Sequence, residues 1–221
     1  VRLGQDWRTA DRHSAGLAPA PAEHRPAIVQ VYAARAFNWR GIFAVHTWIA
    51  TKPKNGRQYK VHQVVGWRAW RGFSSVVSRT DRPDRNWYGA IPVVVGELNG
   101  HAAAKAIPKI EQAVRRYPFE YRYAAWPGPN SNSFTAFVGR EVPELKMDLP
   151  VTAIGKDYLS RGRWLASAPS GTGHQISLWG AVGVLLAWEE GLELNVLGLS
   201  FGLDPSGPAV KLPGIGRLGP H

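Results

Sequence analysis

Two residues in this chain have side chains suited to nucleophilic chemistry, the hydroxyl of Ser131 and the imidazole of His46. Ser131 lies in Trp126-Pro-Gly-Pro-Asn-Ser-Asn-Ser-Phe134, where a proline-rich turn precedes small polar residues typical of a helix start. A helix start presents free backbone N–H groups and a partial positive charge. An imidazole that removes the hydroxyl proton would make Ser131 a nucleophile. The alternative is that Ser131 only caps the helix, a role that Asn130 or Asn132 could fill instead.

His46 lies in a segment that alternates like a half-buried strand, residues 41–51. One face carries Phe43, Val45, Thr47 and Ile49, and the other carries Ala44, His46, Trp48 and Ala50. The Asn-Gly pair at 55–56 predicts a hairpin turn, and residues 59–67 predict the returning strand. A turn centred near 55 places position 46 opposite about 64, so His62 or Gln63 is within reach to orient the imidazole. A purely structural hydrogen-bonding role for His46 is the alternative.

The hydrophobic pattern of the first two thirds predicts an antiparallel sheet with helices. Together with 41–51 and 59–67, we predict strands at 27–32, near Val76 and at 92–98, which form a meander. Apolar residues at helical spacing predict a helix over 103–117, which Pro108 either kinks or opens. A second helix is predicted over 131–138.

The last third is dominated by apolar residues. The run 178–188 is about half the length needed to span a bilayer, so we predict a buried helix over 175–190, with an interfacial helix as the alternative. Gly191 is placed to end it. Residues 192–203 alternate in two phases, which indicates a strand pair or one bent strand, and the tail from 212 is expected to be extended.

The composition limits the partners and cofactors. The chain has 27 Lys and Arg against 16 Asp and Glu, giving a net charge of +11 that favours anionic partners such as lipid headgroups or cell-wall fragments. The basic residues are scattered and no RNA-binding or zinc-finger signature is present, so specific nucleic-acid binding is not expected. The absence of Cys excludes disulfides and thiol nucleophiles. The histidines lack metal-ligand spacing, and we expect no metal and no cofactor.

Three further groups of residues admit a functional and a structural interpretation. Ser170-Gly-Thr-Gly173 could bind an anion with its backbone N–H groups or be a plain turn, and it lacks the phosphate-binding loop spacing. Glu189 and Glu190 could be acid–base carboxylates or a solvated helix end. Lys156, next to Asp157, could add charge to a cleft or form a surface contact.

The order of a strand histidine, further strands and Asn130-Ser131-Asn132-Ser133-Phe134 at a helix start resembles circularly permuted papain-like proteins. These include the NlpC/P60-related, lecithin–retinol acyltransferase-like and PPPDE-type groups. The resemblance covers roughly residues 40–140 and implies a nucleophile at Ser131 with His46 as its base. Ser131 stands where those proteins have Cys, so the resemblance allows either a serine-dependent hydrolase or an inactive binding fold.

Four other segments resemble the bacterial family called domain of unknown function 3750. They are Phe43-Ala-Val-His-Thr-Trp-Ile-Ala50, Pro127-Gly-Pro-Asn-Ser-Asn-Ser-Phe134, Leu149-Pro-Val-Thr-Ala-Ile-Gly-Lys-Asp-Tyr158 and Lys211-Leu-Pro-Gly-Ile-Gly-Arg-Leu218. No established activity comes with this resemblance. Members often begin with a hydrophobic segment, which implies a periplasmic or membrane-associated location through residues upstream of Val1.

These observations lead to one set of predictions. The fold is α+β, an antiparallel sheet packed against a few helices, for which the resemblance implies a circularly permuted papain-like arrangement. Residues 1–27 are predicted to be an irregular segment or tether and 28–221 a single domain. The function is that of a cell-envelope hydrolase or acyltransferase, or of a non-catalytic module that binds an anionic or lipidic envelope ligand. The candidate catalytic residues are Ser131, His46 and His62. The candidate ligand-binding residues are Trp126, Asn130, Asn132, Ser133, Trp48 and Lys156.

Overall fold

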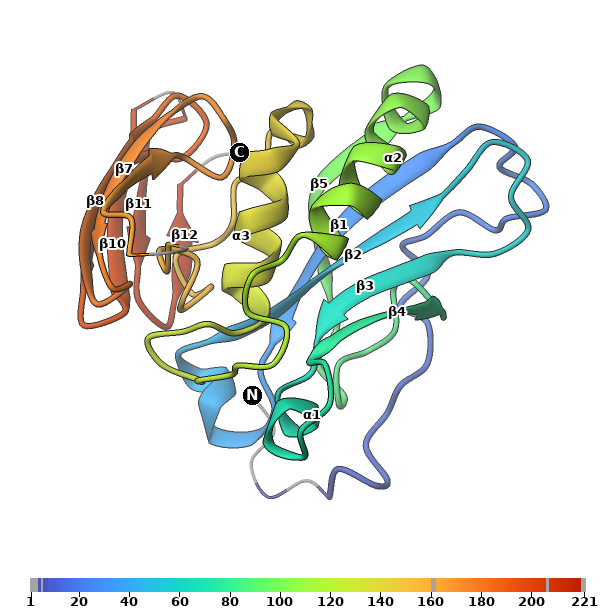
Figure 1. Cartoon of the computed structure of the whole chain (residues 1–221), viewed down its shortest axis with the longest axis horizontal. Coiled ribbons are helices and arrows are strands. Elements are labelled where there is room, and N and C mark those ends of the chain that lie inside the picture. Colours follow the sequence, from blue (N-terminus) through green and yellow to red (C-terminus); the bar gives the residue numbers. More distant parts are fainter. Residues whose placement is uncertain (1–3, 5, 160–161, 206, 220–221) are drawn as a thin grey trace.

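Two antiparallel sheets form the framework of the fold, with helix α3 (Ser131–Glu141) between them (Figure 1). The structure is a computed structural model, and it describes residues 4, 6–159, 162–205 and 207–219. The α+β prediction is confirmed.

The first sheet has the strand order β4-β3-β2-β1-β5. Its strands are β1 (Ile28–Arg35), β2 (Val45–Lys52), β3 (Lys60–Val64), β4 (Val76–Thr80) and β5 (Val93–Asn99). The first four strands form the predicted meander. The fifth returns to the opposite edge and pairs with β1 rather than with β4.

Alternation along the strands gives this sheet two buried faces. Val29, Val31 and Ile49 belong to one apolar cluster, which α3 and the helix α2 (Gly100–Arg115) cover. Tyr32 and Trp48 belong to a second cluster on the opposite face. The predicted helix at 103–117 is therefore present, starts three residues earlier and carries Pro108 inside it.

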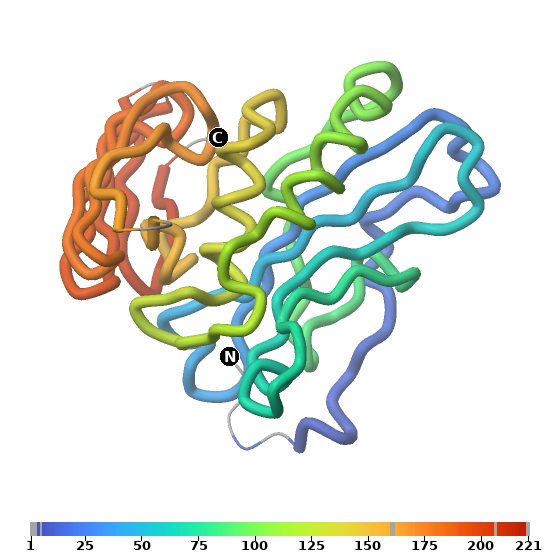
Figure 2. The backbone as a smooth tube through the Cα atoms, viewed as in Figure 1, coloured from blue at the N-terminus to red at the C-terminus, as the bar shows by residue number. Residues whose placement is uncertain are grey.

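The irregular segment before β1 covers this second face. Trp48 Nε1 donates to the carbonyl of Pro83 on the same face, and the Tyr59 hydroxyl donates to the carbonyl of Pro19. Lys52 Nζ donates to the carbonyls of His24 and Pro26 at 2.8 Å. Figure 2 shows this dark blue segment running along the sheet to the β2–β3 turn.

Short helical turns connect the longer elements. They are η1 (Asn38–Ile42), α1 (Gly66–Trp70) and η2 (Pro143–Leu145). In the part of the chain that the structure describes, no helix has the length and apolar character needed to cross a bilayer.

The second sheet is a seven-stranded meander formed by the last third of the chain. Its strands are β6 (Leu165–Ser167), β7 (Gly173–Leu178), β8 (Val182–Ala187), β9 (Gly191–Val196), β10 (Leu199–Asp204), β11 (Ala209–Leu212) and β12 (Gly216–Leu218). The strand pair predicted over 192–203 is present as β9 and β10.

The predicted helix over 175–190 is wrong, because these residues form the β7–β8 hairpin. Trp179 and Gly180 turn the chain with positive φ angles of 53° and 72°, which breaks any helix after Leu178. Gly191 does not end a helix. It opens β9 with a φ of 74°, and a Cβ there would collide with the Leu203 carbonyl of the neighbouring strand.

The polarity of the two faces of this second sheet is the reverse of that in an ordinary half-buried sheet. Its inward side chains include the buried polar residues Gln175, Glu193 and Asn195, while aliphatic side chains of β8–β10 point outward and are exposed.

Candidate functional site

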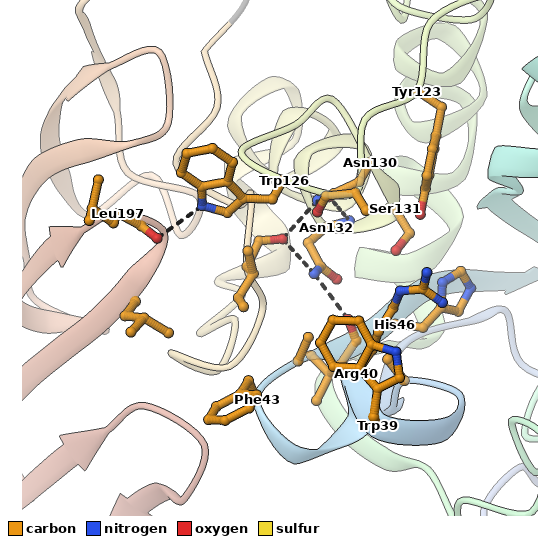
Figure 3. Close-up of a pocket in the computed structure, with 16 residues that line it drawn as sticks. Trp39, Arg40, Phe43, His46, Tyr123, Trp126, Asn130, Ser131, Asn132 and Leu197 are labelled. Atoms are coloured by element: carbon orange, nitrogen blue, oxygen red, sulfur yellow. Dashed lines mark hydrogen bonds between the residues drawn. The ribbon is translucent and has the colours of Figure 1, made fainter. Parts of the chain in front are cut away.

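A pocket of about 460 Å³ opens where the β1–β2 end of the first sheet, the start of α3 and the β9–β10 turn meet. Its lining comes from all three regions of the chain, including Arg40, His46, Ser131 and Leu197 (Figure 3). Five of the nine predicted site residues line it, namely His46, Trp126, Asn130, Ser131 and Asn132.

The start of α3 is fixed by Asn130. Its side chain accepts hydrogen bonds from the backbone N–H groups of Asn132 and Ser133 at 2.9 and 3.1 Å, and the Ser133 hydroxyl closes a capping box with the Asn130 N–H. Asn130 Nδ2 also donates to the carbonyls of Ala125 and Ile154. Asn130 therefore caps the helix and ties two loops to it.

Because Asn130 is the cap, the hydroxyl of Ser131 takes no part in capping the helix. Ser131 is the first residue of α3, and its Oγ has no hydrogen-bond partner among the described residues. The oxygen is also not sealed from solvent. The Ser131 hydroxyl is therefore open to the pocket at the positive end of an eleven-residue helix.

Asn132 and Thr47 attach the helix start to the sheet. Asn132 Nδ2 donates to the carbonyls of Val45 and Ile154 at 3.0 and 2.8 Å, and the Thr47 hydroxyl lies 3.0 Å from Asn132 Oδ1. Both side chains are buried and their polar atoms are paired. Their role at the pocket is to hold the loops in place.

His46 reaches the same pocket from the opposite face of β2. Its ring stacks on the Trp87 ring with the centroids 3.6 Å apart, and its Nε2 lies 3.1 Å from Gln63 Oε1. With the amide oxygen as acceptor, Nε2 carries the proton and Nδ1 keeps a lone pair. Burial lowers the pKa of His46 to about 4, against which the Gln63 hydrogen bond acts, so the imidazole is neutral near pH 7.

The strand register explains why Gln63, and not His62, contacts His46. Ile49 pairs with His62, which shifts the pairing by one residue from the register assumed for position 46. Because neighbouring strand residues point to opposite faces, this shift moves His62 to the α3 side of the sheet. There its Nδ1 lies 2.8 Å from the Ser78 hydroxyl, and burial lowers its pKa to about 4.

No hydrogen bond joins His46 to Ser131 among the described residues, although both line the pocket. In Figure 3 the His46 ring, the Arg40 guanidinium and the Ser131 hydroxyl point toward one another across one side of the cavity. These three groups therefore line the same part of the pocket, but Ser131 and His46 lack the hydrogen bond that would join a nucleophile to its base.

Arg40 and Tyr123 complete this polar side, and neither was predicted from the sequence. The Arg40 side chain is exposed, belongs to η1 and forms no ion pair with a described residue; it lies over the Trp39 ring. Burial raises the pKa of Tyr123, and the charge of Arg40 opposes this rise, so the two side chains sense each other. Apart from its charge, no sequence pattern marks Arg40, because a short exposed turn carries no periodicity.

The other side of the pocket is apolar. Phe43, Trp126, Ile154, Leu197 and Leu199 line it, and Figure 3 shows Phe43, Trp126 and Leu197 on this side. Trp126 Nε1 donates to the Leu197 carbonyl at 2.9 Å. This contact needs Gly198, since a Cβ there would collide with the indole.

The remaining predicted site residues lie elsewhere. Trp48 is buried on the second face of the first sheet and donates to Pro83, and Ser133 is used by the capping box. Lys156 is buried between the sheets, with Nζ 2.5 Å from Glu193 Oε2. Burial lowers the pKa of Lys156, but the carboxylates around it act more strongly and raise it. None of the three lines the pocket.

The Ser170–Gly173 turn donates hydrogen bonds to the carboxylate of Glu190. Glu190 is buried and accepts from the Ser170 hydroxyl at 2.5 Å and from the Ser170 N–H at 2.9 Å. The anion held by this turn is thus a carboxylate of the chain itself. No group of three His, Cys, Asp or Glu within the described ranges is arranged to hold a metal ion.

The fold and the pocket define a class of protein: a two-sheet α+β protein with one half-polar, half-apolar cavity at a helix start. The family model for proteins of unknown function called DUF3750 matches residues 26–158, more than half of the chain, so the chain belongs to this family. The match covers the first sheet, α2 and α3 but not the second sheet. No curated protein and no solved structure matches the chain significantly.

Proposed function

We propose that the pocket binds a single-chain amphiphile, with an acyl chain on its apolar side and an anionic headgroup on its polar side. The observation that carries this proposal is the division of one cavity into Arg40, Ser131 and Tyr123 on one side and Phe43 and other apolar side chains on the other. A cavity of about 460 Å³ is within the range of small-molecule sites.

Charge supports an anionic headgroup. Arg40 is a permanent cation without an ion-pair partner among the described residues, and the α3 start adds a partial positive charge. His46 is neutral near pH 7 and adds a hydrogen-bonding group without a charge. A carboxylate or phosphate would therefore find favourable partners there.

The net charge of +11 and the resemblance of the sequence to envelope-associated proteins support a location at the cell envelope. An acyl lipid or its hydrolysis product is the ligand class that we propose at that location. Fractionation of cells that express the natural protein tests this part of the proposal, and recovery only with cytosolic markers would contradict it.

Calorimetric titration with hexadecanoic acid, and with hexadecanol as an uncharged ligand of equal chain length, tests binding. Arg40→Gln is expected to weaken hexadecanoate binding about tenfold, the loss of one charged hydrogen bond, and to leave hexadecanol unchanged. Phe43→Ser is expected to weaken both ligands. Arg57→Gln, in the exposed β2–β3 turn, removes the same charge outside the pocket and serves as the control. Equal binding of hexadecanoate by the wild type and Arg40→Gln would contradict the proposal.

A second candidate is serine-dependent acyl transfer at the same site, favoured by the unpaired Ser131 hydroxyl beside His46. Ser131 Oγ would bond to the ester carbonyl carbon while His46 Nδ1 takes the hydroxyl proton. The ester alcohol would leave with that proton, and water would then release the acid from the acyl-serine. A pKa of about 4 makes His46 a weak base, which is why binding ranks first.

Release of p-nitrophenol from a p-nitrophenyl acyl ester distinguishes the two candidates. Catalysis predicts that Ser131→Ala and His46→Gln each lower the rate at least a hundredfold and that mass spectrometry finds an acyl group on Ser131. Rates equal to the wild type in both variants would exclude the dyad while leaving hexadecanoate binding intact.

A further inference from the structure

The outer face of the second sheet is an exposed apolar surface. We define the outer face as the outward positions of β8, β9 and β10, which alternate between Val182 and Leu203. All nine of these positions hold aliphatic residues or Phe, and Leu186 is 65% exposed. Their cross-strand pairing places Val184, Leu194 and Phe201 side by side in one row.

The extent of this surface is unusual for a protein surrounded by water. Nine half-exposed apolar side chains present on the order of 800 Å², whereas the largest apolar patch of a typical monomer is about 300–600 Å². In Figure 1 the second sheet forms one side of the molecule, with its other face turned toward α3. Exposed apolar surfaces of this size mark sites of contact with another protein or with a membrane.

Exposed tryptophans stand at both ends of the strands that carry the outer face. Trp164, whose carbonyl accepts from the Ser177 N–H, and Trp179, which precedes β8, lie at the end of the strands nearest the pocket. Trp188 lies in the β8–β9 turn at the other end. Trp179 and Trp188 are each 76% exposed. Indole rings prefer the boundary between hydrocarbon and headgroups, because they have an apolar body and a polar N–H.

The distribution of charge favours a lipid surface over a second copy of the chain as the binding partner of the outer face. Residues 165–221 contain two basic and four acidic residues, so residues 1–164 carry +13. The outer face itself has no charged side chain, while Arg163 is exposed beside Trp164 at its margin. Two copies packed face to face would bring two strongly cationic bodies together, whereas an anionic membrane surface attracts the same charge.

We propose that the outer face docks the protein onto an anionic lipid bilayer, with Trp164, Trp179 and Trp188 at the depth of the headgroups. Strands of six residues are roughly 20 Å long, so the sheet lies on the membrane rather than across it.

The outer face also leads into the pocket. Leu199 is the first outward residue of β10 and lines the pocket, and Leu197 in the preceding turn lines it as well. A docked protein therefore presents the apolar side of its pocket next to the membrane, where an amphiphile would enter. Membrane docking itself requires neither ligand binding nor catalysis in the pocket.

Flotation of the full chain with vesicles of phosphatidylcholine, alone or with 30% phosphatidylglycerol, tests the docking. The wild type is expected to float with the anionic vesicles. The double variant Leu186→Glu with Leu194→Glu is expected to lose at least tenfold in partitioning, since both side chains are exposed on the outer face. Ile91→Glu with Val93→Glu introduces the same charge at exposed apolar positions outside this sheet and is expected to float like the wild type.

Three results would overturn the proposal: no flotation of the wild type, equal flotation of the Leu186→Glu, Leu194→Glu variant, or a wild-type dimer that does not float and that this variant makes monomeric. The last result, measured by analytical ultracentrifugation, would assign the outer face to a second copy. Hexadecanoate titration of the same variant in solution keeps docking and pocket binding distinguishable, because the pocket is expected to bind normally without the docking surface.

Discussion

At the scale of single residues, two buried imidazoles make the stability of this protein depend on pH. Burial lowers the pKa of both His46 and His62 to about 4 from an ordinary value of 6.5. Between these values the unfolded chain binds protons that the folded chain does not, so stability is full above about pH 6.5 and falls as the pH drops toward 4. Each imidazole accounts for about 2 kcal/mol of unfolding free energy between pH 7 and pH 5.

Buried carboxylates act in the opposite direction, which makes a variant comparison necessary. Burial raises the pKa of Asp157 and Glu190, so these groups take up protons more readily when folded and favour the folded state as the pH falls. Urea unfolding of the wild type and His46→Gln at pH 7 and pH 5 isolates the imidazole. The variant is expected to lose about 2 kcal/mol less than the wild type over this interval.

His101→Gln, at an exposed position on α2, is the control and is expected to keep the wild-type dependence. A His46→Gln variant that loses as much stability as the wild type between the two pH values would show that His46 binds its proton while folded. Such an imidazole would be a stronger base than its burial allows, and the catalytic candidate would gain support.

At the scale of elements, the start of α3 depends on one side chain. Asn130 caps the helix and donates two hydrogen bonds to loop carbonyls. Asn130→Ala is expected to lower the unfolding free energy by about 2–4 kcal/mol, because it removes a cap and the two hydrogen bonds to the carbonyls of Ala125 and Ile154. Asn130→Ser keeps a capping hydroxyl and is expected to lose about 1 kcal/mol less.

Urea denaturation measures both variants of Asn130. If Asn130→Ala and Asn130→Ser were equally stable, the capping bonds would contribute nothing and the loop contacts would carry the whole effect. Hexadecanoate titration of Asn130→Ser then reports how far the pocket depends on the position of these loops.

The elements also show what the sequence can and cannot predict. Short-range patterns predicted β2, α2 and the helix start at Asn130, because alternation, helical spacing and capping residues are local signals. The β7–β8 hairpin was predicted as a helix, because an apolar run interrupted by glycines has no clear period, and its alternation is apolar outward. An error of one residue in the β2–β3 register moved His62 to the wrong face.

The pocket itself could be predicted only in part. Ser131 and His46 were found from residue type and local context, but Arg40, Tyr123 and Leu197 come together only through the packing of three distant segments. Register and the position of the second sheet are set by long-range contacts, which a single sequence does not reveal.

At the scale of the whole molecule, a buried ion network ties the second sheet to the segment that follows α3. Glu193 of β9 lies 2.5 Å from Lys156 Nζ and 3.2 Å from Lys211 Nζ, and Lys211 also pairs with Asp148 at 2.9 Å. Lys156 and Asp148 belong to the segment between α3 and the second sheet, so the network fixes this connecting segment against β9 and β11.

Glu193→Gln is expected to destabilise the protein by about 3–5 kcal/mol, since two buried ammonium groups lose a common partner. Glu120→Gln, at an exposed position, removes the same charge and is expected to change stability by less than about 0.5 kcal/mol. Thermal and urea unfolding measure both. A Glu193→Gln variant as stable as Glu120→Gln would mean that the lysines are held by Asp148 and by backbone carbonyls alone.

This network also predicts how the molecule unfolds. The family match ends at residue 158, yet the second sheet supplies Glu193 and Lys211 to the network and Leu197 and Leu199 to the pocket. We therefore expect the two sheets to unfold as one cooperative unit.

Hydrogen exchange followed by mass spectrometry at increasing urea is expected to show peptides from β1–β2 and from β8–β10 opening with the same free energy, within about 1 kcal/mol. Peptides from β8–β10 that open at lower urea, while those from β1–β2 stay protected, would show that the second sheet is a separate unit. Glu193→Gln is expected to make the second sheet open at lower urea, because it weakens the ion pairs that hold this sheet to the segment after α3.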